Sequence, residues 1–564
     1  MFKRAGVLFF VMIMLMSLTI PALAQPGNSQ GQSAAAFDQR IVRNLDVDRA
    51  MEHLHVLTKD IGTRPGGLEN EEIAAQYIAD YLEDLGYDPW IQEFEVMDEY
   101  IGNITAHGAE EWFGEGEWGF NEWHGTFWET TANSAGPFTG EDEKVSGYVI
   151  DCGAGGPGEF PEEVEGNIAL MDWSRLVDPP YEPFEDVVER AEDAGATGLL
   201  VYSLVGGRGQ YGQTFRFGVP ANIPVLGLAK AHGRWLQEMA EELNVFVDLQ
   251  TFHYSDLTSQ NVIATKSAKS DDAPIVVVGG HYDSVIGAPG ANDNGSGTVT
   301  VMELARVLKK FNTDEYELRF AWWGSEERGL LGARHYVNEL SDEDLDRHVA
   351  KYNIDMVATS EYERAPTLFL ETVDGQPNIV TDSALDAANR LGYVGIEQSL
   401  FPASDHVPFH YAGIPAAMFI WLGGAGTPWD YTIERFYHTP QNTIEENICV
   451  DRLEMVMEIA GSTVHDLVRK PVPALDRAAI RSDFGTMDYT GFWCFQCERV
   501  FRNDRIYAGK EVHPGKRGGY WCPFCGASPM KTLDWHSFIF GPGAPNNYTD
   551  QPLDGFLYPL HAIS

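Results

Sequence analysis

The chain has 564 residues, of which 44% are hydrophobic and 22% are charged. These ordinary values exclude wholesale disorder, a collagen-like chain and a coiled coil, and at roughly 150 residues per domain the length predicts about three or four domains. The 84 acidic against 39 basic side chains give a net charge of -45, which repels phosphate backbones and argues against nucleic acid as a partner.

Residues 1–24 predict a cleaved secretory signal peptide. Lys3 and Arg4 precede an apolar run over residues 5–18, and residues 21–24 (PALA) provide a cleavage site of the Ala-x-Ala type. An uncleaved membrane anchor is the alternative, but the run is shorter than the roughly 20 residues that a spanning helix needs, and no later run approaches that length. We therefore expect a secreted, extracytoplasmic protein without stable membrane insertion. Its residues 25–40 are rich in Gln, Gly, Ser and Ala and predict a disordered leader.

Amphipathic patterning begins at residues 68–85, which predict a helix that stops at Gly86. The expected buried stripe of this helix consists of Ile73, Tyr77, Ile78, Tyr81 and Leu82. A strand is predicted at residues 88–96. Four tryptophans follow, and burial habits favour packing of a small sheet over binding of sugar or peptide for them: Trp112, Trp118, Trp123 and Trp128.

The rest of the chain divides into two patterns before the tail. Residues 145–249 contain short predicted strands around a helix near residues 187–194, without a cluster of catalytic residue types, and predict a separate module. Residues 261–470 alternate apolar strands with amphipathic helices, with strands at 274–278 and 318–323 and helices at 297–310 and 329–340. This alternation predicts an α/β domain with a mixed, mostly parallel sheet flanked by helices.

Residue types that bind metals follow the predicted strands of the α/β domain. In open α/β sheets, ligands bind beyond the carboxyl ends of the strands. Imidazoles and carboxylates occur at those positions, and one more carboxylate opens the helix at residue 297: His281, Asp283, Asp293, Glu326, Glu327, Asp355 and His438. Each alone could be a buried histidine or a solvated carboxylate. Together they predict a site for borderline dications, and two imidazoles with three carboxylates suit two ions that share one carboxylate.

Six segments of this domain resemble, in the same order, the motifs of the double-zinc exopeptidases, the family that includes bacterial leucine aminopeptidases, aminopeptidase Y and glutamate carboxypeptidase. The segments are residues 280–284 (GHYDS), 292–297 (NDNGSG), 324–332 (GSEERGLLG), 353–356 (NIDM), 404–409 (SDHVPF) and 437–439 (YHT). Residues 62–66 (GTRPG), with the helix after them, are similar too. The resemblance spans most of residues 261–460.

The resemblance implies how two zinc ions are held. Asp293 would bridge both ions. His281 and Asp355 would complete one site, and Glu327 and His438 would complete the other.

The resemblance also implies which residues act on the substrate. Glu326 would be the general base, Asp283 would accept the second ring N–H of His281, and Tyr437 would stabilise the oxyanion. The family often has an Asp shortly after the final His-Thr, where this chain has Gln, Asn and Thr at residues 441–443. This departure concerns the surroundings of the ligands and is expected to have a small effect on metal affinity.

Domain boundaries follow from the same resemblance. Residues 41–110 are expected to form the N-terminal part of the peptidase domain, and residues 256–470 its metallopeptidase catalytic part. Residues 111–255 resemble the protease-associated domain that several family members insert, on the strength of residues 195–202 (GATGLLVY) and 223–226 (IPVL). The insert would either roof the active-site cleft or serve only as a packing module.

Residues 471–564 predict a zinc-ribbon-like C-terminal region. Two Cys-x-x-Cys pairs, with 24 residues between them, favour one structural zinc ion over disulfides or iron: Cys494, Cys497, Cys522 and Cys525. Cys152 and Cys449 lie in different modules and are expected to be unpaired.

The sequence therefore predicts a secreted aminopeptidase with two catalytic zinc ions that acts on peptides with a free amino terminus. The alternatives are a carboxypeptidase of the same family, a single-zinc cyclase relative and a non-catalytic, receptor-like relative. The ribbon-like tail favours the aminopeptidase, because glutamate carboxypeptidase carries a large helical C-terminal domain instead. The complete set of ligand positions argues against the non-catalytic relative.

Overall fold

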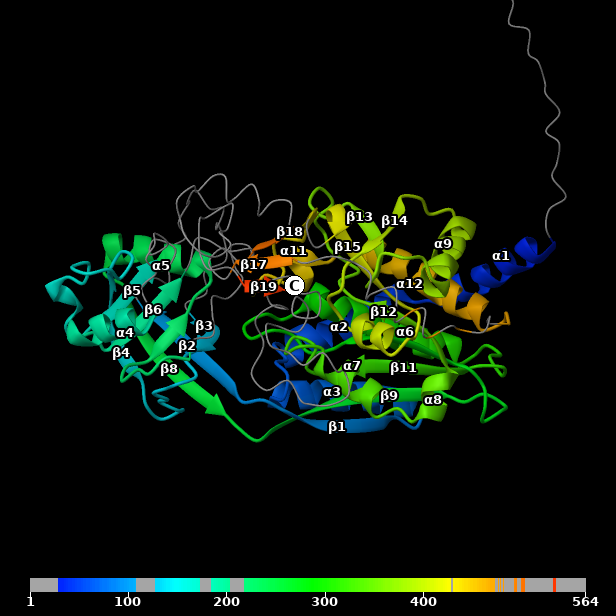
Figure 1. Ribbon diagram of the computed structural model, residues 1–564, viewed down its shortest axis with the longest axis horizontal. Helices are drawn as coiled ribbons and strands as arrows, with labels where there is room; N and C mark the ends of the chain where they lie inside the picture. Colours follow the sequence, from blue (N-terminus) through cyan, green and yellow to red (C-terminus); the bar gives the residue numbers. More distant parts are fainter. Residues whose placement is uncertain are drawn as a thin grey trace, which may run out of the picture.

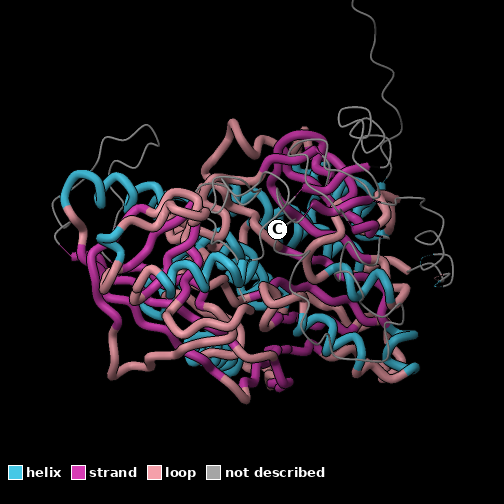
Figure 2. The backbone as a smooth tube through the Cα atoms, turned by 60° about the vertical axis from the view of Figure 1, so that its left-hand side comes forward, coloured by secondary structure: helices cyan, strands magenta, loops and turns pink. Residues whose placement is uncertain are grey.

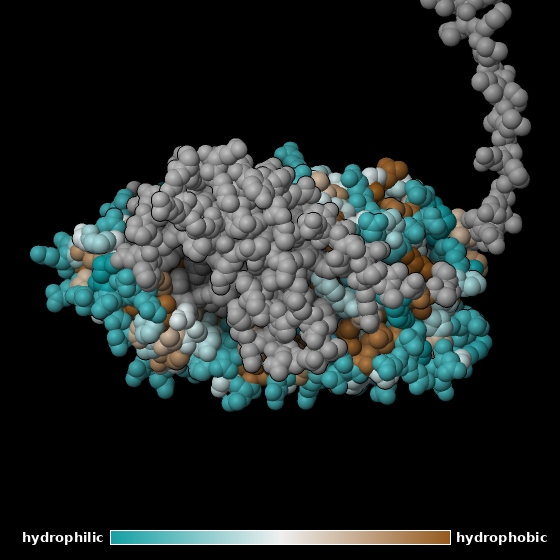
Figure 3. All heavy atoms as spheres, viewed as in Figure 1, coloured by the Kyte–Doolittle hydropathy of each residue, from teal (hydrophilic) through white to brown (hydrophobic). Residues whose placement is uncertain are grey.

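The computed structural model describes residues 29–107, 127–172, 184–202, 218–427 and 430–471, with residues 475, 477 and 480 and the segments 491–494, 499–502 and 531–533. A barrel forms one end of the molecule, and a sheet flanked by helices forms the other (Figure 1). Figure 2 shows the strands of the two parts as separate groups, and Figure 3 shows hydrophilic residues along the rim of one face. No helix among the described residues is long and apolar enough to cross a membrane. The expected signal peptide, residues 1–24, lies outside them.

A mixed sheet forms the centre of the larger part. Its strands are β1 (Trp90–Val96), β9 (Leu257–Lys266), β10 (Ile275–His281), β11 (Glu317–Trp323), β12 (His348–Ile354), β13 (Thr367–Thr372), β14 (Ile396–Leu400), β15 (Ala416–Thr427) and β16 (Asp430–Thr432). They run in the order β1-β9-β11-β10-β12-β15-β13-β14, and β16 pairs with β15. The central strands β11, β10, β12 and β15 are parallel, whereas β9 is antiparallel to β1 and β11 and β13 is antiparallel to β15. The predicted mixed α/β sheet is confirmed.

Helices cover both faces of this sheet. One face carries α2 (Val47–His55), α3 (Glu69–Asp84), α6 (Gly297–Leu308), α9 (Ile379–Leu391) and α12 (Val450–Leu467), with α1 (Ser29–Val42) packed on α9 and α12. The other face carries α7 (Leu331–Asn338), α8 (Asp342–Arg347) and α10 (His406–Tyr411). The short α11 (Ile444–Asn447) lies beside the irregular turn Ala291–Ser296.

The side chains of β10 point alternately to the two faces of the sheet, so the strand contributes to a hydrophobic core on each face. Val276 and Val278 pack into the cluster that contains α6 and α12, and Ile275 and Val277 pack into the cluster on the side of α7 and α10. A strand buried on both faces is apolar throughout, which is how the sequence predicted it. At the end of β10, a Cβ on Gly280 would lie 2.4 Å from the backbone oxygen of Ile354, so only glycine allows β12 to approach this closely.

The inserted module is a closed barrel with the strand order β2-β3-β7-β6-β5-β4-β8. Its strands are β2 (Glu99–His107), β3 (Phe127–Ala132), β4 (Val145–Asp151), β5 (Ile168–Asp172), β6 (Gly198–Tyr202), β7 (Val225–Gly227) and β8 (Phe246–Tyr254), with helices α4 (Phe184–Asp193) and α5 (Lys230–Leu243). Trp128 on β3 is buried against Trp235 of α5 at a ring separation of 5.1 Å. The prediction that these tryptophans pack a small sheet is therefore confirmed for Trp128. Trp112, Trp118 and Trp123 lie outside the described residues.

A small antiparallel sheet is described in the C-terminal region. Its strands β17 (Gly491–Cys494), β18 (Arg499–Arg502) and β19 (Lys531–Leu533) have the order β18-β17-β19. Cys494 ends β17, and the other three cysteines of the predicted ribbon lie outside the described residues, so the zinc ribbon stays a prediction. Cys152 and Cys449 are free thiols, as expected.

The predicted disordered leader is wrong from residue 29 onwards, because Ser29–Val42 forms α1. Ile41 is fully buried in the main core, and the carboxylate of Asp38 accepts a hydrogen bond from Arg390 Nε at 2.6 Å. The Ser- and Ala-rich composition hides this helix, since α1 is held by contacts with α9 and α12, hundreds of residues away in the sequence.

Helix α3 forms as predicted, but its buried stripe differs. Ile73 is 45% exposed, whereas Ala74 and Ala79 are buried beside Ile78 and Leu82. Small residues face the sheet because α3 packs directly on β9, where large side chains would hold the helix away.

The insert also begins earlier than expected. Residues 99–107 fall within the predicted peptidase part (residues 41–110), yet they form β2, which pairs with β3 and β8 inside the barrel. Long-range pairing decides the boundary, and the local sequence of an amphipathic strand does not show which sheet it joins.

Candidate active site

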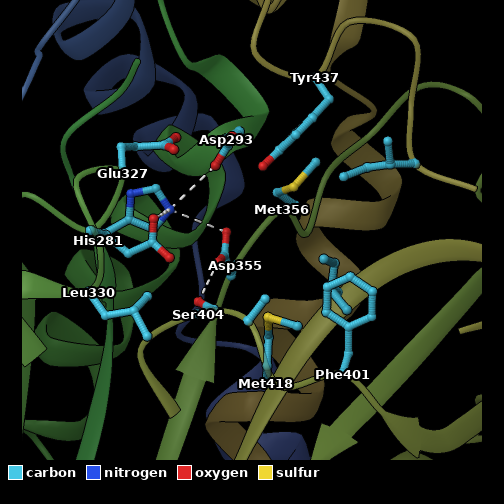
Figure 4. A pocket seen from close by; sticks show the side chains of 14 residues that line it. His281, Asp293, Glu327, Leu330, Asp355, Met356, Phe401, Ser404, Met418 and Tyr437 are labelled. Atoms are coloured by element: carbon cyan, nitrogen blue, oxygen red, sulfur yellow. Dashed lines mark hydrogen bonds and ion pairs between the residues drawn. The ribbon is translucent and has the colours of Figure 1, made fainter. Parts of the chain in front are cut away.

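The predicted ligands meet at one edge of the sheet. His281 is the last residue of β10, Glu326 and Glu327 follow β11, and Asp355 follows β12. These strands are parallel neighbours, and β10 ends level with β11 because His281 pairs with Trp323. Their carboxyl ends therefore place imidazole and carboxylate groups side by side (Figure 4).

Asp293 lies between the two imidazoles. Its Oδ1 is 3.3 Å from His281 Nε2, and its Oδ2 is 3.1 Å from His438 Nε2. Glu327 Oε2 lies 3.0 Å from the same nitrogen of His438. All four side chains are buried. One carboxylate thus presents an oxygen to each histidine, which is the arrangement expected of a bridging ligand.

The remaining carboxylates surround His281 on its other side. Asp355 Oδ1 lies 3.5 Å and Glu326 Oε2 lies 3.8 Å from His281 Nε2. Ser404 Oγ donates to Asp355 Oδ2 at 2.6 Å and accepts from Asn353 Nδ2 at 2.7 Å, which holds this carboxylate in one orientation.

Asp283 supports both the histidine and the glutamate pair. Its Oδ1 lies 3.3 Å from Nδ1 of His281, and its backbone oxygen lies 3.2 Å from the same nitrogen. The same carboxylate also accepts the backbone N–H of Glu326 at 3.0 Å and that of Glu327 at 3.1 Å. It therefore fixes the peptide from which these two side chains diverge, a role that the sequence did not show.

Burial and like charge dominate the electrostatics of the site. Burial raises the pKa of Glu326 well above its usual value, and the nearby carboxylates raise it further. Burial, with the charge of Asp293, raises the pKa of Glu327 to about 7. Burial alone would lower the pKa of His438, but Glu327 and Asp293 outweigh it and raise that pKa to about 9. The cluster carries more negative charge than its own imidazoles can balance.

The residues present fit divalent metal ions. Glu327 Oε1 and Asp355 Oδ1 are buried oxygens that accept no hydrogen bond from the described part of the chain. Two groups have the spacing of a metal site, namely His281 with Asp293 and Glu327, and His281 with Glu326 and Asp355. Imidazole and carboxylate are zinc ligands. Buried like charges are costly unless cations compensate them, so the cluster is suited to holding cations.

A pocket opens beside the carboxylates. Apolar side chains form most of its wall: Leu330, Met356, Phe401, Ala403, Met418, Ile420 and Ile433. Tyr437 points into this pocket from the opposite side to His281 (Figure 4). The arrangement combines a polar, metal-binding end with an apolar cavity.

Several supporting residues received no role from the sequence. Asn294 Oδ1 accepts the backbone N–H of Gly297 at 2.9 Å and that of Met356 at 3.2 Å, which joins the Asp293 turn to the end of β12. Glu71 of α3 is fully buried and accepts the N–H of Ser325 at 2.8 Å, next to the glutamate pair. No local pattern marks Glu71, because the first turn of a helix commonly carries acidic residues.

Comparison with known proteins identifies the family. Residues 261–464 match Peptidase family M28, and residues 133–236 match the PA domain. Aminopeptidase YwaD of Bacillus subtilis (strain 168) is 34% identical over 419 residues, which cover 73% of this chain and 83% of that protein. The chain belongs to peptidase family M28.

Other relatives of this M28 chain agree. The probable lipoprotein aminopeptidase LpqL of Mycobacterium tuberculosis is 28% identical over 470 residues, covering 76% of this chain and 86% of that protein. The solved structure of BSAP, a zinc aminopeptidase from Bacillus subtilis, is similar with a TM-score of 0.54 and 32% identity, covering 77% of this chain and 98% of that one. The predicted family and its inserted protease-associated domain are confirmed.

Proposed function

We propose that this M28 chain is a zinc aminopeptidase that removes N-terminal residues from peptides. The observation that carries the proposal is the position of Asp293, whose two oxygens face two different imidazoles, each with a further carboxylate beside it. The relatives named zinc aminopeptidase and aminopeptidase support the direction of attack.

The distances in the site support the ligand roles that we propose. Asp293 would bridge the two ions, His281 and Asp355 would complete one site, and Glu327 and His438 would complete the other. Two zinc ions held by these residues would polarise the scissile carbonyl and lower the pKa of the attacking water.

The chain's own groups then move the proton and hold the charge. Glu326 accepts the proton of the attacking water on its carboxylate and delivers it to the departing amine. Asp283 keeps Glu326 in place through its backbone N–H. Tyr437 donates its O–H to the developing oxyanion. Each role uses a residue that lies at the pocket or directly behind it.

The pocket supports a substrate class. Its apolar wall fits an apolar first side chain, because such cavities gain affinity chiefly by excluding water from apolar surface. The excess of buried carboxylates beside it fits the ammonium group of a free amino terminus. We therefore expect peptides that begin with a residue such as Leu or Met to be preferred.

Mass spectrometry of a peptide with Leu at its first position tests the proposal, with the N-acetylated peptide as the control. Loss of residues from the amino end, in the free peptide alone, is the expected result. Shortening from the carboxyl end would instead establish a carboxypeptidase. Two intact peptides would refute peptidase activity on this substrate class and direct attention to a cyclase or binding role.

Two variants test the assigned roles. Glu326→Gln should lower turnover by about 100- to 10,000-fold while zinc content is unchanged, because the base is not a ligand. His281→Ala should lose zinc and activity together. Full activity in the Glu326 variant, or zinc loss from it, would contradict the assignment of Glu326 as the base.

We also propose a structural zinc ion in the C-terminal region and export of the mature chain. The antiparallel strands β17 and β18, with Cys494 at the end of β17, support the ribbon. Zinc analysis should give three ions per chain, and one fewer after Cys522→Ser and Cys525→Ser. The signal-like segment at residues 1–24 supports export, and the N-terminal sequence of the mature protein tests it.

A further inference from the structure

Glu434 is a buried carboxylate that the catalytic roles leave unused. It lies between β16 and His438 and is 2% exposed. Three asparagines donate side-chain N–H groups to it: Asn292 Nδ2 to Oε2 at 2.7 Å, Asn442 Nδ2 to Oε1 at 3.3 Å, and Asn447 Nδ2 also to Oε1. An ionised carboxylate accepts all three hydrogen bonds, whereas an amide in its place would turn a donor towards one of them.

These contacts determine how two of the amides are oriented. With its Nδ2 towards Glu434, Asn442 turns Oδ1 to the backbone N–H of Asn292 at 2.6 Å and of Asp293 at 3.5 Å. In the same way, Asn292 Oδ1 accepts the N–H of Ala358 at 2.8 Å. The backbone at residues 292–293 is thus held by amides whose orientation depends on Glu434.

The position of Asp293 depends on that backbone. Its two oxygens lie 3.3 and 3.1 Å from the Nε2 atoms of His281 and His438. A movement of residues 292–293 would change both distances at once. Because metal–ligand distances tolerate errors of only about 0.2 Å, such a movement would weaken both metal positions together.

We propose that Glu434 is a positioning residue for the metal centre, acting through Asn292 and Asn442 to hold Asp293 where one carboxylate reaches both zinc ions. The inference rests on the proposed function for the presence of the two ions. Burial raises the pKa of Glu434 to about 8, whereas hydrogen bonds from Thr359 and Asn447 favour its ionised form. Zinc ions held at Asp293 would offset the charge of that carboxylate, which raises the pKa of Glu434 further.

Glu434→Gln is the direct test, because it keeps the shape and replaces one acceptor by a donor. We expect zinc affinity, measured by competition with a chelator, to fall about 10- to 100-fold. Cobalt substitution separates the sites, because only cobalt bound to cysteine shows thiolate charge-transfer absorption. Glu361→Gln is the matched control: Glu361 acts on Glu434 through its charge but accepts from Arg435 rather than from the asparagines. The control should retain nearly full zinc affinity.

A double variant separates positioning from general damage. In E434Q/N442D the carboxylate has moved to position 442, where it can accept from the amide at 434 and from the N–H groups of Asn292 and Asp293. We expect most of the zinc affinity to return. If E434Q does not fold, N442A, which removes one amide link to Asp293, decides the question and should lower zinc affinity about tenfold.

The inference would be overturned if E434Q bound zinc as tightly as E361Q does. If E434Q does not fold, the same comparison is made with N442A. A wild-type chain that binds two zinc ions outside the cysteine site but cleaves no peptide would refute the aminopeptidase, while the chelator competition would still test Glu434. A wild-type chain that binds zinc only through cysteine would overturn both.

Discussion

Arg64 binds the loops behind the metal centre, and replacing it measures how much this one side chain contributes to the stability of the fold. The guanidinium is fully buried and donates to five backbone oxygens: those of Tyr282 at 2.8 Å, Leu57 at 3.0 Å, Gly62 at 2.7 Å, Pro289 at 2.7 Å and Gly290 at 3.2 Å. These acceptors belong to the turn after α2, to the residue after His281 and to the segment before Asp293. We predict that Arg64→Lys, which keeps the charge, strongly destabilises the fold.

The magnitude follows from counting donors. A lysine ammonium has three N–H groups on a single nitrogen, whereas the donors of Arg64 are spread over three nitrogens, so about two of the five carbonyl groups lose their donor. Each buried acceptor left unpaired costs about 1–3 kcal/mol, which predicts a loss of about 2–6 kcal/mol in the free energy of unfolding. Urea unfolding of the zinc-saturated chain measures it, with Arg49→Lys at a 43% exposed side chain as a control expected within about 0.5 kcal/mol. A loss below about 1 kcal/mol for Arg64→Lys would refute this reasoning.

Three further predictions concern other parts of the molecule. Burial lowers the pKa of His348 to about 3, so the unfolded chain binds a proton that the folded chain excludes. His348 should therefore contribute a fall of about 1.4 kcal/mol per pH unit to the unfolding free energy as the pH is lowered from about 6.5 to about 3, and His348→Gln should reduce the slope by that amount in urea titrations. Ser404→Ala removes the hydrogen bond to Asp355 and should lower zinc affinity about tenfold in chelator competition, whereas unchanged affinity would show that the bond is dispensable. Trp128→Ala should destabilise the barrel by about 3–5 kcal/mol in thermal unfolding, and a smaller loss would mean that its contact with Trp235 is loosely packed.

The ligand set could be predicted because its signal is local. His281 and the glutamate pair each follow a largely apolar strand, Asp355 follows the short stretch at residues 353–354, and parallel strands end at the same edge of a sheet. Once the strands were recognised, the meeting of these side chains followed from topology alone. The same argument explains why β10 and β11 could be predicted, since strands buried on both faces are mostly apolar. The strand β12 has a weaker signal, because Lys351 and Asn353 interrupt its apolar pattern.

The supporting residues could not be predicted because their signal is distant. Arg64 reaches acceptors more than two hundred positions away, and Glu434 accepts from Asn292 across 142 positions. Helix α1 depends in the same way on an ion pair between Asp38 and Arg390. A single sequence does not distinguish a buried charged residue, which pairs with a distant partner, from a solvated charged residue on the surface.

The departure from the family motif at residues 441–443 acquires a physical meaning from these contacts. An Asp at position 442 would face Glu434 across a distance that now joins an amide N–H to a carboxylate, and two buried carboxylates there would repel each other. Asn442 can instead donate to Glu434 and accept from the Asn292 and Asp293 N–H groups at once. The negative charge next to the Asp293 backbone therefore resides on Glu434. Asn442 links Glu434 to that backbone, because it donates to Glu434 and accepts from the N–H groups of residues 292 and 293. On this argument Asn442→Asp alone, with Glu434 intact, should weaken zinc binding, although it moves the chain closer to the family pattern.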